Sequence, residues 1–159
     1  MNTAIKAGLI LAVAVTLVSA VMIGAGLHEN FIVSSVVSLV IYIGLNIAIL
    51  FWALSKTASD CGYGKQLLNS LIIGLVGGFV IFLGSYLLLG VVFPDSIDRM
   101  REGAIVFLEN ANLPEEQMNA QVAKLDAATP VSQSLTGLWG TLGTSLIVGA
   151  IISIFKRKK

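Results

Sequence analysis

The stretch from Leu67 to Phe93 reads LLNSLIIGLVGGFVIFLGSYLLLGVVF and contains no Asp, Glu, Lys or Arg. A helix needs about 20 apolar residues to cross the hydrocarbon core of a bilayer, so this stretch is long enough, with room for tilt. An open strand at that depth would leave backbone amides unpaired in lipid. The stretch therefore predicts a membrane-spanning helix.

Three further apolar runs have the same character, and they cover Ala7–Leu27, Phe31–Leu54 and Leu135–Phe155. The chain of 159 residues is 56% hydrophobic and only 12% charged, and its mean hydropathy is +0.90. Soluble domains carry about 25% charged residues. We therefore expect one all-α integral membrane domain over residues 1–159, a bundle of four transmembrane helices whose main partner is the lipid bilayer.

The connections between the runs differ in length and polarity. Residues 28–30 leave almost no linker, so the first two runs form a tight hairpin, and residues 55–66 form a short polar loop. His28 and Glu29 are expected to be solvated residues of that first hairpin. The 94–134 segment is too polar to enter the membrane, so we expect it to fold outside the bilayer.

Helical signals recur within the 94–134 segment. Asp95 and Asp98 favour a helix start, and apolar residues then follow at helical spacing as far as Leu108. Asn112 can cap a second, shorter helix over residues 114–126, and Pro130 is expected to end the segment before the last span.

Seven of the nine acidic residues lie in the 94–134 segment, which carries a net charge of −4. Such a surface is either simply solvated, or it docks a basic partner or attracts cations. The candidate partner-facing residues are Glu109, Glu115 and Glu116.

Orientation follows from the placement of Lys and Arg, which are enriched in cytoplasmic loops. Seven of the ten lie before the first run, in the 55–66 loop or in the carboxyl-terminal tail, and three lie in the 94–134 segment. This asymmetry predicts that both termini are cytoplasmic. A competing interpretation is that the first run is a cleaved signal peptide.

Small and weakly polar residues recur four positions apart, so they share one helix face. They predict close helix packing within one chain, or alternatively contact with a second copy or another membrane protein. The candidate packing residues are Gly74 and Gly78 in the third run, Gly137, Thr141, Ser145, Gly149 and Ser153 in the fourth, and Asn46 near the middle of the second. An amide such as that of Asn46 needs a hydrogen-bonding partner inside the membrane.

Signatures of catalysis and of cofactor binding are missing from the sequence. One cysteine and one histidine cannot form a Cys/His zinc site, no nucleophile motif occurs, and the net charge of +1 does not indicate nucleic acid. The four runs also lack the buried acid on which proton-coupled small drug exporters rely. We expect no enzyme, no cofactor, no metal and no nucleic-acid partner.

Four stretches of the chain resemble the bacterial domain-of-unknown-function family numbered 4199. They are AIKAGLI at the first helix, SDCGYGKQLLNSLIIGL at the entry to the third, FPDSIDRMREGAIVFLENANLPEEQMNAQV in the outer segment, and IISIFKRKK at the end. A Tyr-Arg-Asp type stretch is absent where this chain has LSKTASD. The resemblance implies a four-helix inner-membrane protein and no particular activity.

Two hypotheses about function remain after these observations. The first is a non-enzymatic accessory or interaction subunit, and the second is an oligomeric transporter of small solutes or ions. A water-filled cavity lined by Ser38, Asn46 and Thr141 would favour the transporter, and a dry bundle would favour the subunit.

Overall fold

The computed structural model describes residues 2–111 and 114–158, and in these residues all regular secondary structure is helical. The spanning helices are α1 (Thr3–Gly24), α2 (Phe31–Lys56), α3 (Tyr63–Leu87) with its extension η1 (Leu88–Val92), and α6 (Pro130–Phe155). All four are long and apolar enough to cross a membrane. The predicted all-α membrane fold is confirmed.

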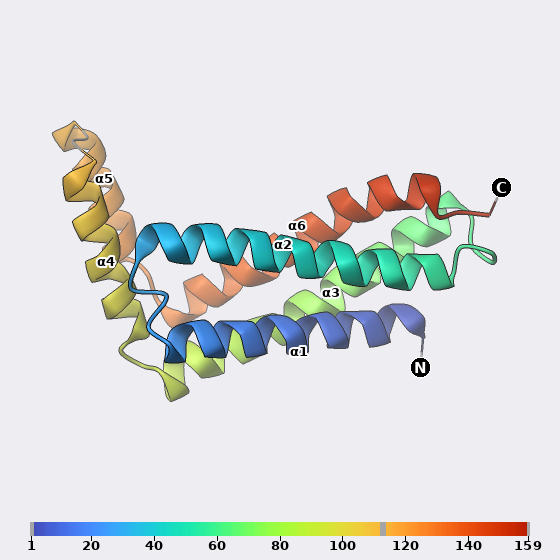
Figure 1. The fold of residues 1–159 in the computed structure, drawn as a ribbon, viewed down its shortest axis with the longest axis horizontal. Coiled ribbons are helices and arrows are strands. Elements are labelled where there is room, and N and C mark those ends of the chain that lie inside the picture. Colours follow the sequence, from blue (N-terminus) through green and yellow to red (C-terminus); the bar gives the residue numbers. More distant parts are fainter. Residues whose placement is uncertain (1, 112–113, 159) are drawn as a thin grey trace.

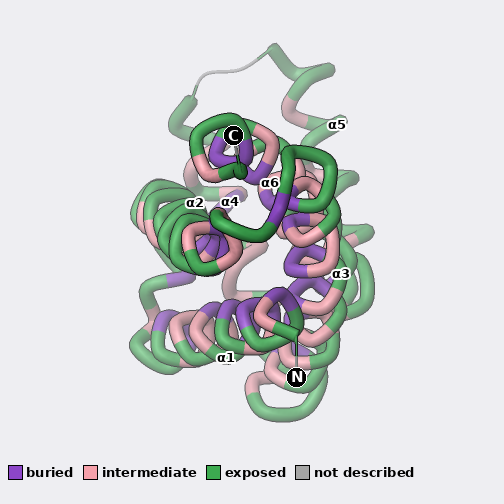
Figure 2. Tube along the Cα trace, turned by 90° about the vertical axis from the view of Figure 1, so that its right-hand side faces the viewer, coloured by how far each residue is buried: buried purple, intermediate pink, exposed green. Residues whose placement is uncertain are grey.

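The four spanning helices form one elongated bundle (Figure 1). Viewed along the bundle, α3 packs closely against α1 and α6, while α2 lies opposite α3 and contacts mainly α1 and α6 (Figure 2). The terminal end of the bundle holds both chain termini and the loop 57–62, and the hairpin end holds the loop 25–30 and the segment 93–129. An even number of spans brings the two termini together.

Local capping explains where the helices begin and end. Gly26 adopts a left-handed φ of 71°, which turns the chain after α1, and the side chain of Asn30 accepts a hydrogen bond of 3.1 Å from the Val33 amide at the start of α2. The segment before the last span does end at Pro130, but Pro130 is itself the first residue of α6, which therefore begins earlier than the predicted run at Leu135. A proline suits a first turn because the amide it lacks would be unpaired there, and Thr129 and Ser132 close a reciprocal capping box.

The 94–134 segment contains the two predicted helices, α4 (Ser96–Asn110) and α5 (Glu115–Asp126). The predicted cap Asn112 lies outside the described residues. The α4–α5 hairpin lies across the hairpin end of the bundle and extends beyond it (Figure 1). Arg101 links the two helices through a 3.3 Å ion pair with Asp126, and Arg99 reaches Glu29 in the 25–30 loop at 3.4 Å.

The apolar core fills the half of the bundle nearer the terminal end. Its fully buried members include Leu11 of α1, Leu50 and Leu54 of α2, and Ile73 of α3. Beneath them the side chain of Gln66 donates hydrogen bonds to the backbone oxygens of Leu54 and Lys156. The half nearer the hairpin end is built differently, because a cavity takes the place of the core.

Candidate functional site

A cavity of about 560 Å³ lies between α1, α2, α3 and α6 in the half of the bundle nearer the hairpin end. Small-molecule sites in proteins typically measure about 300 to 1,000 Å³, so the volume suits a small ligand. We call it the bundle cavity. Its polar lining residues are Ser19, His28, Ser34, Ser35, Ser38, Tyr42, Asn46, Ser85, Gln133, Thr136, Thr141 and Thr144.

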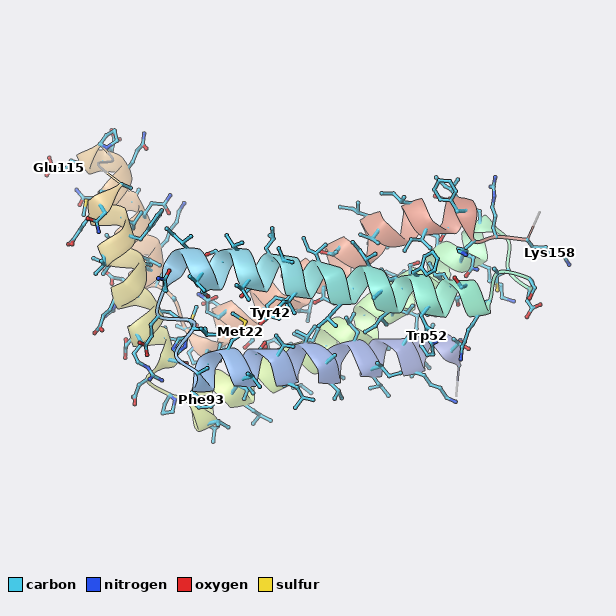
Figure 3. All side chains as sticks on the ribbon, in the orientation of Figure 1. Met22, Tyr42, Trp52, Phe93, Glu115 and Lys158 are labelled. Atoms are coloured by element: carbon cyan, nitrogen blue, oxygen red, sulfur yellow. The ribbon has the colours of Figure 1, made fainter. Side chains whose placement is uncertain are left out.

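One face of α2 supplies much of the polar wall. Ser34, Ser38, Tyr42 and Asn46 are spaced four apart, so they share this face. The Tyr42 hydroxyl forms a 2.8 Å hydrogen bond with Ser19 of α1. Met22 and Tyr42 point into the space between α1 and α2 (Figure 3). Asn46, which the sequence predicted as a packing residue, therefore belongs to a helix face that lines the bundle cavity.

Asn46 and Ser145 close the cavity on the side of the apolar core. The Asn46 side-chain nitrogen donates a hydrogen bond of 3.3 Å to the Ser145 hydroxyl, and the hydroxyl can donate one of 3.3 Å to the Asn46 side-chain oxygen. Both side chains are buried. This pair joins α2 to α6. Asn46 thus has the partner that an amide inside a membrane requires, and it also lines the cavity.

The cavity opens sideways between α2 and α6. Leu39 lines the cavity from α2 and is also 62% exposed on the outside of the bundle. Gly140 on α6 is likewise both cavity-lining and exposed. Because both residues lie well inside spanning helices, this opening faces the depth at which lipid chains would lie.

His28 lies at the hairpin-end boundary of the cavity, and it corrects the sequence-based expectation. The side chain was expected to be solvated, but it is only 4% exposed. Among residues 2–111 and 114–158, neither ring nitrogen has a hydrogen-bonding partner. Glu29, by contrast, is exposed and paired with Arg99 as a loop residue would be.

A second cavity of about 230 Å³ lies under the α4–α5 hairpin. We call it the outer cavity; Ile97, Arg101 and Ala104 of α4 line it together with Leu125 of α5. The residues that line both cavities are His28, Ser34, Ser35, Met100 and Gln133. These five residues form a neck between the two cavities.

Four of the eight predicted packing residues lie in the contact between α3 and α6: Gly74, Gly78, Ser145 and Gly149. A Cβ added at Gly74 would lie 2.9 Å from the Ser145 Cβ, and one at Gly78 would lie 3.1 Å from the Leu138 oxygen. Gly149 faces the side chain of Ser70 so closely that any side chain there would collide with it. The absence of side chains at these glycines lets the two backbones approach.

The remaining predicted packing residues divide between two places. Ser153 is buried and donates a hydrogen bond to the Gly149 oxygen of its own helix. Gly137 and Thr141 line the bundle cavity instead. The π-helical extension η1, which the sequence did not indicate, contributes Leu88 and Leu89 to the cavity wall. Such π-turns often occur at functional sites.

The candidate partner-facing residues are remote from the cavity. Glu109, Glu115 and Glu116 are exposed on the α4–α5 hairpin, and we call them the acidic face. Glu115 lies at the far tip of the hairpin (Figure 3). The structure therefore separates two candidate sites, the bundle cavity and the acidic face.

The described residues contain no group of three or more His, Cys, Asp or Glu side chains that could hold a metal ion. Cys61, the one cysteine, is buried in the loop at the terminal end, where its backbone oxygen accepts a hydrogen bond from the Lys158 amide. The bundle cavity, by contrast, gathers hydroxyl, amide and imidazole groups around one volume.

Comparison with known families gives one match of nearly full length. Residues 6–158 match the family described as "Protein of unknown function (DUF4199)". Comparison with curated proteins and with solved structures gives no match. The match includes all four spanning helices, the α4–α5 hairpin and every residue that lines the bundle cavity. This multi-pass membrane protein therefore belongs to the DUF4199 family.

Proposed function

We propose that this protein is a membrane carrier that binds a small uncharged molecule in the bundle cavity. The observation that supports this proposal is a cavity of about 560 Å³ with Ser38, Asn46 and Thr141 in its wall. A bundle whose only role was structural would be expected to fill this volume with side chains, as the half nearer the terminal end does. The cavity therefore favours the carrier hypothesis over the accessory-subunit hypothesis.

The chemistry of the wall favours an uncharged ligand. Hydroxyl and amide groups line the cavity, and no Asp, Glu, Lys or Arg among the described residues does. A charged ligand would be transferred from water to a site without a counter-charge, which is costly at membrane depth. A neutral molecule exchanges its hydrogen bonds with water for hydrogen bonds with the wall.

The packing of α2 suits a carrier, since a carrier must change the access to its site. The α3 helix contacts α1 and α6 closely, whereas α2 is held mainly by α1, by the Asn46–Ser145 pair and by the apolar core near the terminal end. A movement of α2 near its first turns would alter both the sideways opening and the neck.

Thiol accessibility tests whether the cavity takes up water and solute. In a background with Cys61→Ala, single cysteines replace Ser38, which lines the cavity, and Val40, which lies on the same helix and is 64% exposed outside it. The reagent is a small hydrophilic methanethiosulfonate applied to the protein in lipid nanodiscs. Modification requires the thiolate, which forms readily only in contact with water, so we expect Ser38→Cys to react at least about tenfold faster than Val40→Cys.

A second variant extends the test to the deep part of the cavity. Thr141→Cys should also react faster than Val40→Cys, because Thr141 lines the same cavity from α6. Equally slow reaction at all three positions would mean a dry bundle, and the carrier proposal would then be wrong.

The second candidate function, a non-enzymatic interaction subunit, is supported by the α4–α5 hairpin. No residue of α5 is buried, and the hairpin extends beyond the bundle (Figure 1). An exposed helix with the adjacent acidic face offers a docking surface for a basic partner, whether a second copy or another membrane protein. The two functions are compatible, since a carrier can also bind a partner.

The proposed location is a bacterial inner membrane, with the terminal end in the cytoplasm. Basic side chains gather at that end, where Lys56 lies 4.6 Å from the centroid of the Trp52 ring and Lys156 lies 4.5 Å from that of Phe51. Lysines and aromatic rings in contact are common at a membrane interface. The α4–α5 hairpin would then lie outside the cytoplasm.

A further inference from the structure

We infer that the molecule bound in the bundle cavity is an uncharged amphiphile, whose hydroxyl-bearing head group lies against His28 and whose apolar chain leaves the cavity between α2 and α6. This inference rests on the proposed carrier function and names the class of its ligand. Three features carry it: the unpartnered imidazole, the neutral neck around it, and the sideways opening.

His28 indicates where the polar part of the ligand lies. Burying a polar group without a hydrogen-bonding partner destabilises a protein, and both ring nitrogens of His28 are in this state among the described residues. A neutral imidazole has one donor and one acceptor. A ligand hydroxyl can both donate and accept, so a diol or similar head group would satisfy the two nitrogens together.

The surroundings of His28 favour a head group without charge. Ser34, Ser35 and Gln133 are the other polar residues of the neck, and all three are neutral. Among the described residues that line the two cavities, the one with a charged Asp, Glu, Lys or Arg side chain is Arg101 in the outer cavity. Its guanidinium is already paired with Asp126 at 3.3 Å and with Asp98 at 3.8 Å. An anionic head group would have to compete with these two carboxylates.

The rest of the cavity suits an apolar chain. Leu39 and Ile43 of α2 and Leu88 and Leu89 at the end of α3 present aliphatic side chains to it. A chain that follows these residues reaches the opening between α2 and α6. On the α6 side of that opening, a Cβ added at Gly140 would have no atom within 4 Å, so nothing there obstructs the chain.

A hydrophilic solute that enters through the outer cavity and the neck is the alternative ligand. It would explain the unpartnered imidazole equally well, but it would make no use of the opening toward lipid. The two kinds of ligand can be distinguished by testing whether a head group without an apolar chain binds in the site.

His28 makes that experiment direct, because it is the one histidine in the chain. The full-length protein, labelled with nitrogen-15 at histidine and placed in phosphatidylcholine nanodiscs, gives a single imidazole whose nitrogen shifts report hydrogen bonding. Three probes are added in turn: monodecanoylglycerol, methyl decanoate, which has a similar chain without hydroxyls, and glycerol, which has the hydroxyls without the chain. We expect monodecanoylglycerol to shift the signals in a saturable way and the other two to leave them unchanged.

Two glycines on α6 provide a matched pair for the opening. Gly140→Leu places a side chain in the opening, whereas Gly143→Leu places the same side chain at a glycine that has equally open surroundings and does not line the cavity. We expect Gly140→Leu to weaken the response to monodecanoylglycerol at least about tenfold and Gly143→Leu to change it less than about twofold, since only the first competes with the chain for space.

Each result decides the inference. Glycerol that shifts the imidazole as strongly as monodecanoylglycerol overturns the amphiphile and leaves the carrier, with a hydrophilic solute as its ligand. An imidazole that responds to none of the probes, or a Gly140→Leu protein that responds like Gly143→Leu, also overturns the inference. The modification rate of Ser38→Cys then shows separately whether the carrier proposal stands.

Discussion

Among the glycines of the spanning helices, Gly149 leaves the least room for a side chain, because α3 and α6 approach most closely there. The variant Gly149→Ala tests this contact. A methyl group at this position would collide with the side chain of Ser70, which is fully buried in α3. The Ser70 hydroxyl can rotate away, but its Cβ cannot. The two helices would therefore have to move apart.

The size of the effect follows from a comparison with Gly143→Ala on the same helix. Overpacking a tight contact costs about 1 to 3 kcal/mol, whereas replacing glycine by alanine in a helix gains up to about 1 kcal/mol from propensity. The added methyl at Gly143 would meet no atom within 4 Å, so that variant reports the propensity gain alone. We expect Gly149→Ala to unfold more easily than Gly143→Ala by about 1 to 3 kcal/mol.

The assay is reversible unfolding from mild detergent by titration with sodium dodecyl sulfate, followed by circular dichroism. A rescue variant strengthens it: Ser70→Gly combined with Gly149→Ala moves the side chain from one helix to the other, and it should recover most of the lost stability. Equal stability of Gly149→Ala and Gly143→Ala would show that the close approach of α3 and α6 is incorrect.

Three further predictions concern the floor of the cavity, the topology and the acidic face. A double-mutant cycle of Asn46→Leu and Ser145→Ala should give a coupling of about 0.6 kcal/mol, and at most about 1.7, in the same unfolding assay, because side-chain hydrogen bonds between membrane helices have this size; no coupling would contradict the bond. Reporter fusions after Ser55 and at the carboxyl terminus should signal cytoplasm, and a fusion at Gln121 should signal the opposite side; a cytoplasmic signal at Gln121 would reverse the orientation. Changing all three glutamates of the acidic face to glutamine should weaken co-purification of a basic partner, most of all at low salt, without affecting unfolding in detergent. The reason is that exposed charges act over a Debye length of about 8 Å at physiological salt. A partner that this variant keeps at every salt concentration, but that Asn46→Leu loses, would place the interaction in the membrane.

The membrane fold could be predicted from the sequence because it depends on length and composition. Four uncharged runs of spanning length leave helix as the one solution, and the predicted runs overlap all four spanning helices. Helix ends were harder to place, since they depend on a few capping contacts. Pro130 could be read as a stop or as a start, and the capping box between Thr129 and Ser132 determines that it is a start.

The bundle cavity could be predicted only in part. Spacing placed Ser38 and Asn46 on one face of the second helix, and the cavity lies against that face. Spacing cannot show whether such a face meets another helix or an open volume, because that depends on how far α2 stands from α3. The sequence context of His28 likewise indicated a solvated loop, whereas the burial of its ring comes from the α4–α5 hairpin lying over the hairpin end.

The two halves of the bundle differ in a way that connects packing with the proposed function. Near the terminal end, Leu11, Leu50 and Leu54 fill the interior, and α2 is fixed there against its neighbours. Beyond the Asn46–Ser145 pair the interior holds the cavity, and α2 separates from α6. A ligand that enters between α2 and α6 therefore meets the part of α2 that lines the cavity, while the contact of α3 with α6 at Gly74 and Gly149 keeps the opposite wall in place. Carrier activity in this fold would follow from that unequal packing, without any Asp or Glu in the described spanning helices.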